Sequence, residues 1–404
     1  MAPTRASGLL GAGEIKRVFL IVMDSFGIGE MPDAWLYKDQ GSNTLRSIVA
    51  SDKYSTPNLE SLGLFNIDGV DFKKSHPSPK ANFARMAESS AGKDTIIGHW
   101  EIAGIISKSP LPTFPEGFPE EFLQEYSKRV GRGILCNQPY SGTKVIADYG
   151  QDHIKTGDLI VYTSADSVFQ VAGHEEVLGL DELYRCSQLA RDMLVGEELG
   201  VGRVIARPFT GQYPNFTRTS NRRDYSLAPP RKTILDYLME AGLETISVGK
   251  ISDIFSGRSI SRSYPSLNNA DGMEKVLDLM EKDFKGLCFV NLVDFDMLYG
   301  HRNDVDGYAG AASEFDRDLE RLMSKMEAED LVIITADHGC DPKTPSTDHS
   351  REYVPMLAYS QSIKAGVNLG TRKTFADIGA TILEIFGLDG DIAGQSFFKD
   401  ISIN

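Results

Sequence analysis

Acidic residues and histidines follow three short apolar runs of the sequence, directly after each run ends. Carboxylates gathered at one place repel one another unless a cation lies between them. Carboxylate oxygen and imidazole nitrogen together suit divalent manganese, zinc or magnesium, and the lack of a nearby thiolate argues against a structural zinc site. The residues concerned are Asp24, Asp294, Asp296, His301, Asp337, His338, Asp348 and His349.

These side chains are numerous enough for two ions. Two metals about 3.5 to 4 Å apart can hold both the attacking and the leaving oxygen in phosphoryl transfer. Taken singly, an aspartate after a strand is more often a helix cap or a turn former, and a loop histidine is usually only exposed. An Asp-x4-His pattern and two Asp-His pairs do not fit that interpretation when they occur together. We therefore predict a two-metal centre.

The segment Ser90–Glu101, SAGKDTIIGHWE, offers a nucleophile. Thr95 is the candidate, because a hydroxyl near a helix start can attack once a metal stabilises its alkoxide. In the alternative, Asp94 or Thr95 caps a helix and Lys93 is a solvated charge, and this segment alone favours that alternative. The order Gly-Lys-Asp-Thr lacks the second glycine and the Gly-Lys-Ser/Thr of a P-loop, which excludes nucleoside-triphosphate binding.

The elements that must position these residues alternate along the chain. Short β-branched runs that are apolar on both faces are typical of strands covered by helices on each side. The pattern predicts a doubly wound α/β sheet, in which ligands bind outside the carboxyl ends of the strands. We expect strands at 18–23, 159–162, 204–206, 245–248, 287–293 and 331–335, and helices at 273–283, 310–326 and 374–386.

Two proline-rich joints interrupt this alternation, PLPTFPEGFP at 110–119 and the pair Pro229 and Pro230. Proline denies the backbone both helix and central-strand pairing, and therefore suits crossings between domains. A chain of 404 residues has room for two or three domains. We predict that residues 108–226 form an inserted domain, and that 1–107 and 227–404 together form the metal-binding core.

The formal charge of −15 argues against nucleic-acid and anionic-membrane partners. No apolar stretch reaches 18 residues, which excludes a membrane span. The four widely spaced cysteines fit a reducing compartment, which predicts a cytoplasmic protein. We expect a disordered leader before Arg17, and its Gly11-Ala12-Gly13 follows no strand and does not indicate dinucleotide binding.

One stretch opposes the overall charge. Residues 201–232 carry a net charge of +6. Guanidinium groups bind phosphate through two parallel hydrogen bonds, although a solvated basic face would look the same in the sequence. Arg203 and Arg207 flank an apolar run that we expect to form a buried strand. This position argues against both side chains being merely solvated surface charges.

Several motifs together resemble those of the prokaryotic phosphopentomutases of the alkaline-phosphatase superfamily. The similarity runs in order from about Arg17 to the C-terminus. TADHG marks only the superfamily, whereas GKDT followed by GHWE, with TSADS and DFD-x4-H, is specific to this mutase family. Ile97 departs from the family, which often has a second threonine there, and leaves Thr95 intact. The motifs include MDSFGIGEMPDA, GKDTIIGHWEIAG, VYTSADSVFQVAGHEE, NLVDFDMLYGHRNDVDGYA and ITADHGCDPKTPSTDHSREYVPML.

The resemblance implies a doubly wound alkaline-phosphatase-like α/β core with a smaller inserted α/β cap domain. It implies that Thr95 carries phosphate, that a sugar bisphosphate serves as its primer, and that the two metals are manganese. Asp294 is left as a helix-start or supporting residue. The first metal is assigned Asp24, Thr95, Asp337 and His338, the second Asp296, His301 and His349, and the sugar phosphate Ser164, Asp166, Arg203, Arg218 and Lys250.

The activity implied is the interconversion of ribose 1-phosphate and ribose 5-phosphate, with 2-deoxy sugars also accepted. The partners implied are small pentose phosphates, and the sequence shows no motif for a partner protein. A metal-dependent phosphatase or phosphodiesterase on the same core is the alternative enzyme. Cofactor-independent phosphoglycerate mutase is a second relative, but it normally has serine where Thr95 stands. A non-enzymatic phosphosugar-binding protein would lack at least one ligand, and none is missing.

Overall fold

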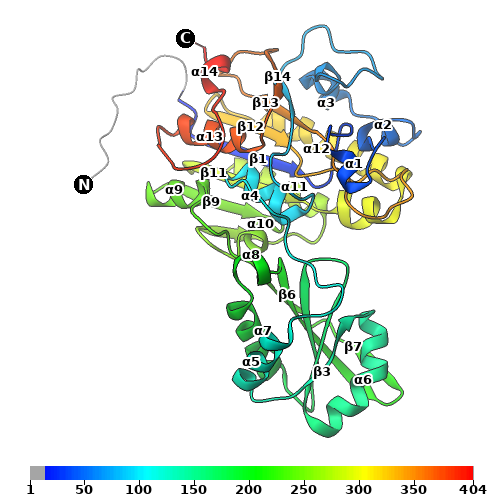
Figure 1. Ribbon diagram of the computed structural model, residues 1–404. Helices are drawn as coiled ribbons and strands as arrows, with labels where there is room; N and C mark the ends of the chain where they lie inside the picture. Colours follow the sequence, from blue (N-terminus) through cyan, green and yellow to red (C-terminus); the bar gives the residue numbers. More distant parts are fainter. Residues whose placement is uncertain (1–13, 404) are drawn as a thin grey trace. The chain divides into compact units, whose positions relative to one another are not determined.

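The computed structural model describes residues 14–403, and most of the leader expected before Arg17 lies outside these described residues. The chain divides into two compact units (Figure 1). One, here called the core unit, comprises the described residues up to 108 together with 229 onward. The other, the inserted unit, comprises residues 109–228.

The core unit is built on an eight-stranded sheet within the described residues, in the order β10-β9-β11-β1-β12-β13-β2-β14. The strands from β10 to β12 are parallel, β13 is antiparallel to both its neighbours, and β2 and β14 are parallel to each other. The bounds are β1 Arg17–Met23, β2 Asn82–Met86, β9 Glu244–Val248, β10 Arg262–Tyr264, β11 Gly286–Leu292, β12 Asp330–Thr335, β13 Val354–Tyr359 and β14 Asn368–Arg372.

β1 lies between the other two strands that precede acidic residues. All seven of its residues are buried, as the apolar run predicts for the six from Val18 to Met23. Met23 is level with Leu292 of β11, and Val22 is level with Thr335 of β12. Because the three strands are parallel and end together, the residues that follow them emerge at one edge of the sheet.

The helices of the core unit form two groups, which lie over the sheet as expected for a doubly wound arrangement (Figure 1). α12 contacts α2, α3 and α11, whereas α13 contacts α4 and α9, and α4 also contacts α10. The bounds are α1 Ala34–Tyr37, α2 Thr44–Val49, α3 Pro57–Leu62, α4 Thr95–Ile102, α9 Ile234–Glu240, α10 Ile251–Ile254, α11 Asn269–Met280, α12 Val305–Lys325, α13 Ala376–Ile385 and α14 Phe398–Ile401. Short η segments are η1 Leu64–Asn66, η2 Phe295–Tyr299 and η3 Gly300–Arg302.

The inserted unit has its own sheet, in the order β3-β4-β5-β6-β7, with β8 paired to β6. Two apolar clusters cover its faces, one with α5 and α7 and one with α6. A separate core of this kind is what an inserted domain needs in order to be stable. The bounds are β3 Ile134–Pro139, β4 Leu159–Thr163, β5 Val168–His174, β6 Arg203–Gln212, β7 Asn215–Arg218, β8 Arg223–Ser226, α5 Glu120–Val130, α6 Gly142–Thr156, α7 Leu180–Met193 and α8 Gly196–Leu199.

Across residues 14–403, none of the helices is both long and apolar enough to cross a bilayer. The four cysteines of the chain all lie in this range, and each is a free thiol.

Candidate metal centre and phosphate acceptor

The six carboxylate and imidazole side chains predicted to bind metal come together at one edge of the core sheet. Carboxylate and imidazole atoms there form groups of three within 4.8 Å of one another. The strands explain the clustering, since β11, β1 and β12 are neighbours and end level. Two groups contain only predicted ligands, Asp24 with Asp337 and His338, and Asp296 with His338 and His349, and a third contains Asp296, His301 and Cys340.

The first group is fully enclosed. His338 Nε2 lies 3.5 Å from Asp24 Oδ1 and 3.3 Å from Asp337 Oδ2. All three side chains are at most 1% exposed. Asp337 Oδ1 accepts a hydrogen bond of 3.0 Å from the backbone N–H of Ser25, which fixes the carboxylate against the end of β1.

The second group is built around Asp296. Its Oδ2 lies 3.1 Å from His301 Nε2, and its Oδ1 lies 3.2 Å from His349 Nε2. The His349 ring also stacks on His338, with 3.8 Å between the ring centroids. The two groups are therefore in direct contact, as two neighbouring ions would require.

The three imidazoles are oriented in the same way. In each, Nδ1 lies within hydrogen-bond distance of a backbone carbonyl, so that Nδ1 donates to that carbonyl and Nε2, once deprotonated, is left for a metal. A histidine held in this manner is ready to bind a metal through Nε2. The pairs are His301 with Thr347 at 2.6 Å, His338 with Gly339 at 3.0 Å and His349 with Lys93 at 2.8 Å.

Three carboxylate oxygens in the cluster are buried and accept no hydrogen bond from any described residue: Asp24 Oδ1, Asp296 Oδ1 and Asp337 Oδ2. A buried carboxylate oxygen without a partner is costly, and a cation removes that cost. The donor set of hard oxygen and imidazole nitrogen fits manganese, zinc or magnesium. The residues present therefore fit the divalent metals that the sequence predicts.

The electrostatics reflect the same crowding. Burial raises the pKa of Asp24 well above its ordinary value, and the carboxylates of Asp337 and Asp296 raise it further. Burial also opposes ionisation of Asp337, yet the nearby His338 and His99 hold its pKa well below the ordinary value. Burial disfavours a charged His338, but the surrounding carboxylates raise its pKa well above 6.5. Without a cation, the raised pKa of His338 favours a positive charge among these carboxylates, a role that a metal ion would take over when bound.

Thr95 is the first residue of α4, and its Oγ1 lies 3.2 Å from His338 Nε2. Asp94 caps the helix, since its carboxylate accepts hydrogen bonds from the backbone N–H groups of Ile96 and Ile97. The ordinary interpretation of Asp94 as a cap is thus right, and it leaves the Thr95 hydroxyl free to face the metal ligands. Lys93 is not a solvated charge, because only 17% of its side chain is exposed and it pairs with Asp39.

Gly98 allows α4 to lie directly against the metal cluster. A Cβ at this helical position would lie 2.3 Å from the backbone oxygen of Asp337, which cannot move without displacing a metal ligand. Gly98→Ala is therefore expected to destabilise the protein by about 2 kcal/mol and to weaken Mn²⁺ binding. Chemical denaturation and calorimetric titration with Mn²⁺ measure the two effects.

Gly310 provides the control for this variant. It lies inside α12, and apart from its chain neighbours and the nearby backbone of that helix, a Cβ there would meet no described atom within 4 Å. Gly310→Ala should stabilise the protein by up to about 1 kcal/mol, because alanine loses less backbone freedom than glycine in a helix. Equal effects at the two positions would show that the close approach of α4 to Asp337 does not matter.

Three residues of the site were missed by the sequence analysis. His99 is fully buried, with Nδ1 3.2 Å from Asp337 Oδ2. Asn291 donates to Asp24 Oδ2 at 2.7 Å. Cys340 corrects the expectation that no sulfur lies near the ligands, but burial raises its pKa far above 9, and its thiol lies 3.6 Å from the Asp348 carbonyl oxygen. His99 was visible inside the GHWE motif, whereas nothing local marked the other two residues.

The residues predicted to contact the sugar phosphate lie in both units. Ser164 and Asp166 lie in the turn after β4, Arg203 begins β6 and Arg218 ends β7, all in the inserted unit. Lys250 follows β9 in the core unit. Asp294 precedes η2 and pairs with Asn269, whose backbone N–H donates to its Oδ2 at 2.7 Å, which agrees with a supporting role.

Comparison with known proteins decides the family. The family model of the metalloenzyme superfamily matches residues 16–390. The phosphopentomutase of Lachnoclostridium phytofermentans is 61% identical over 387 residues, covering 96% of this chain and 99% of its own. That of Caldanaerobacter subterraneus subsp. tengcongensis is 54% identical, with 96% and 99% covered. The chain belongs to the phosphopentomutase family.

Membership in the phosphopentomutase family makes the protein a metalloenzyme of the isomerase class, as predicted. A phosphoglycerate mutase structure from Leishmania mexicana has the same fold, with a TM-score of 0.51 at 11% identity, covering 99% of this chain and 100% of that one. The predicted fold class, a doubly wound alkaline-phosphatase-like α/β core with a smaller inserted α/β domain, is confirmed.

Proposed function

We propose that the protein interconverts ribose 1-phosphate and ribose 5-phosphate, and the 2-deoxy sugars likewise, through a phosphothreonine at Thr95 and a sugar bisphosphate. Family membership supports the reaction. The observation that carries the mechanism is the position of Thr95 Oγ1, 3.2 Å from His338 Nε2 in a cluster of three carboxylates. Each carboxylate has one buried oxygen without a hydrogen-bond partner among the described residues.

The proposed cycle conserves every group. The sugar hydroxyl attacks the phosphate on Thr95, the Oγ1–P bond breaks, and a sugar bisphosphate forms. Thr95 Oγ1 then attacks the phosphate at the other end of the sugar, whose O–P bond breaks. The proton lost by the first hydroxyl is balanced by the proton gained by the second, so neither water nor a net proton is consumed. A sugar bisphosphate primer phosphorylates Thr95 before the first cycle.

The proposed metal ligands are Asp24, Thr95, Asp337 and His338 for one ion and Asp296, His301 and His349 for the other. Two divalent ions, manganese in this proposal, supply charge neutralisation of the phosphoryl group when bound. The protein contributes orientation, because the carbonyl contacts of the imidazoles and the hydrogen bonds to Asp24 and Asp337 fix the ligands in advance.

The inserted unit carries a concentration of positive charge suited to a sugar phosphate. Arg207 lies on β6, where burial lowers its pKa and the guanidinium groups of Arg222 and Arg218 lower it further. Like charges gathered in this way favour a bound anion. Tyr162 is 1% exposed, and its hydroxyl has no hydrogen-bond partner among the described residues.

The N-terminus of α6 adds to this charge. Gly142 begins α6, and a Cβ at Gly142 would collide with the guanidinium of Arg218 and lie 2.7 Å from the Tyr162 hydroxyl. The first backbone N–H groups of a helix favour phosphate, and the cap residue Ser141 accepts no hydrogen bond from them. These features support a role in phosphate binding for Arg218. For Ser164, Asp166, Arg203 and Lys250, the proposed contact with the sugar phosphate rests on the family resemblance.

The proposed partners are small pentose phosphates alone, without nucleic acid, membrane or partner protein. The proposed location is the cytoplasm. The four free cysteines are compatible with a reducing compartment.

The product of the reaction tests the proposed function. The Mn²⁺-loaded enzyme, primed with ribose 1,5-bisphosphate, should convert ribose 1-phosphate into ribose 5-phosphate, followed by ³¹P NMR. Ribose 5-phosphate should accumulate with little inorganic phosphate. Rapid release of inorganic phosphate without ribose 5-phosphate would identify a phosphatase and overturn the proposal.

A further inference from the structure

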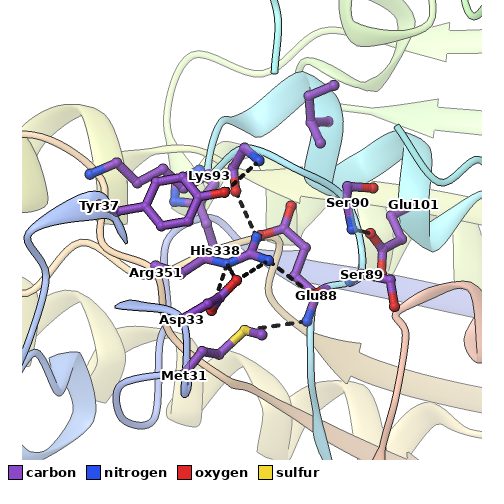
Figure 2. Close-up of polar contacts among 12 residues, drawn as sticks. Met31, Asp33, Tyr37, Glu88, Ser89, Ser90, Lys93, Glu101, His338 and Arg351 are labelled. Carbon is purple, nitrogen blue, oxygen red and sulfur yellow. Dashed lines mark hydrogen bonds and ion pairs between the residues drawn. The ribbon is translucent and has the colours of Figure 1, made fainter. Parts of the chain in front are cut away.

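Arg351 is a buried arginine that the reaction outlined above does not use. Its side chain is 3% exposed and is surrounded by acceptors from separate parts of the core unit (Figure 2). Nη1 donates to Glu88 Oε2 at 2.5 Å, and Nη2 contacts Asp33 Oδ2 at 3.0 Å. A buried arginine is stable only when its donors are satisfied, and here most of them are directed at one loop.

That loop is residues 88–94, here called the acceptor loop, which leads directly into Thr95. Arg351 Nη1 donates to the carbonyl of Gly92 at 2.7 Å, and Nη2 donates to the carbonyl of Glu88 at 3.0 Å. Gly92 has a φ of +143°, which places this turn in a conformation that few other residues adopt. One guanidinium therefore holds the acceptor loop at its first residue and again at Gly92, three residues before Thr95.

The same arginine lies two residues after His349, and the His349 segment is joined to the acceptor loop a second time. His349 Nδ1 lies 2.8 Å from the carbonyl oxygen of Lys93, and Lys93 Nζ donates to the carbonyl of His349 at 2.5 Å. Asp39 ties the two partners together, accepting from the backbone N–H of Arg351 at 2.9 Å and from Lys93 Nζ at 3.1 Å.

Tyr37 completes the arrangement from α1. Its ring lies 5.2 Å from the Arg351 guanidinium and 6.0 Å from the Lys93 ammonium. Its hydroxyl accepts from the backbone N–H of Gly92 at 3.2 Å. Figure 2 shows Tyr37 and Arg351 beside Lys93 of the acceptor loop.

We propose that Arg351 is a positioning residue that fixes the acceptor loop against the His349 segment, so that the Thr95 hydroxyl and the His349 imidazole keep a constant relative position. The guanidinium fork is needed for this, because it reaches Glu88, Asp33 and Gly92 at once, and a lysine ammonium cannot. The structural part of this proposal is independent of the proposed function. Only its expected effect on phosphate transfer rests on the proposed role of Thr95.

Hydrogen–deuterium exchange of the metal-free protein tests the positioning directly. In the structure, the amides of the acceptor loop donate to Glu101, Ser107 and Tyr37. Arg351→Lys should increase the exchange rate of peptides covering 88–95 at least about tenfold, while peptides from β11 keep the wild-type rate. Unchanged exchange at 88–95 would overturn the proposal.

Arg17 provides a matched control in the same unit. It is also buried, and it forms a two-point ion pair with Asp330, at 2.6 and 2.8 Å. Arg17 begins β1, whereas Asp24 follows the end of that strand. Seven strand residues span about 23 Å, so Arg17 lies far from the metal ligands. Arg17→Lys should lower the unfolding midpoint as Arg351→Lys does, but leave exchange at 88–95 unchanged. The same exchange increase in both variants would indicate general loosening and contradict the proposal.

Metal affinity and Thr95 phosphorylation extend the test to the site. Arg351→Lys should weaken Mn²⁺ binding and slow phosphorylation from ribose 1,5-bisphosphate by about 10- to 100-fold each, as losses of supporting contacts do. If Arg351→Lys does not fold, Arg351→Met with Glu88→Gln removes the ion pair without leaving a buried charge, and the same changes are expected. The two proposals can fail separately. If Arg351→Lys exchanges faster at 88–95 but the wild-type protein never carries phosphate on Thr95, the proposed function is rejected and the positioning role stands.

Discussion

Replacing Thr95 by alanine is expected to reduce mutase turnover by at least about 10⁴-fold, because removal of a nucleophile leaves only the binding contributions of the site. The variant should fold normally, since Asp94 caps α4 and alanine is a good helix former. Intact-mass spectrometry after incubation with ribose 1,5-bisphosphate should show one phosphate on the wild-type protein and none on the variant.

Two controls sharpen this experiment. Thr95→Ser keeps an oxygen near His338 Nε2 and should retain phosphorylation and a measurable turnover. Ser90 is the other hydroxyl of the same segment, but its Oγ accepts from the backbone N–H of Ser107 at 3.1 Å, and Ser90→Ala should still be phosphorylated. Undiminished phosphate on the Thr95→Ala protein would place the phosphate acceptor at another residue.

Replacing Asp24 by asparagine is expected to change stability and metal binding in opposite directions. Burial and the neighbouring Asp337 and Asp296 disfavour the ionised form, as the raised pKa of Asp24 shows. A neutral amide should therefore raise the unfolding midpoint of the metal-free protein. The same change removes a charged ligand and should weaken Mn²⁺ binding at least about 100-fold, with a comparable loss of turnover. Scanning calorimetry with a chelator and calorimetric titration with Mn²⁺ separate the two effects.

The sign of the stability change has a physical reason in the hydrogen bonds of Asp24. Oδ2 accepts from Asn291, which an amide oxygen can also do, whereas Oδ1 has no hydrogen-bond partner among the described residues. Asp236 is the contrasting case, because both its oxygens accept hydrogen bonds, from the backbone N–H of Thr233 and from Ser259. Burial opposes its ionisation, but these hydrogen bonds hold its pKa below the ordinary value. Asp236→Asn should lower the midpoint and leave Mn²⁺ affinity unchanged. A lower midpoint for metal-free Asp24→Asn would contradict the assignment of Asp24 as a strained ligand.

The parts of the site that could be predicted are those encoded within a few residues. An apolar run followed by acid marked the ends of β1, β11 and β12, whereas only the structure shows that these three strands are neighbours in the sheet. The three strands at one side of the core sheet, β13, β2 and β14, were not predicted. β13 contains Pro355, and β14 is partly exposed at the sheet edge, and neither shows the continuous β-branched run of a central strand.

The supporting residues were beyond sequence reasoning for a different reason. Asn291 lies inside β11, where it is indistinguishable from a buried polar residue of any strand until Asp24 is placed beside it. Arg351 makes its contacts with residues 33, 88 and 92, which are separated from it by more than 250 positions. Contacts between residues so far apart in the sequence depend on the complete packing of the core unit, and no local sequence pattern predicts them.

The position of β1 constrains the order in which the chain can fold during synthesis. Both of its neighbours, β11 and β12, come after the inserted unit, at residues 286–292 and 330–335. At ribosomal rates of about 5 to 20 residues per second, this apolar central strand waits on the order of 15 to 60 seconds for both partners. Residues 109–228, which have their own apolar clusters, emerge in the meantime. The nascent chain thus exposes its most apolar strand longest, and we expect aggregation before the emergence of β12 to limit its yield at high expression.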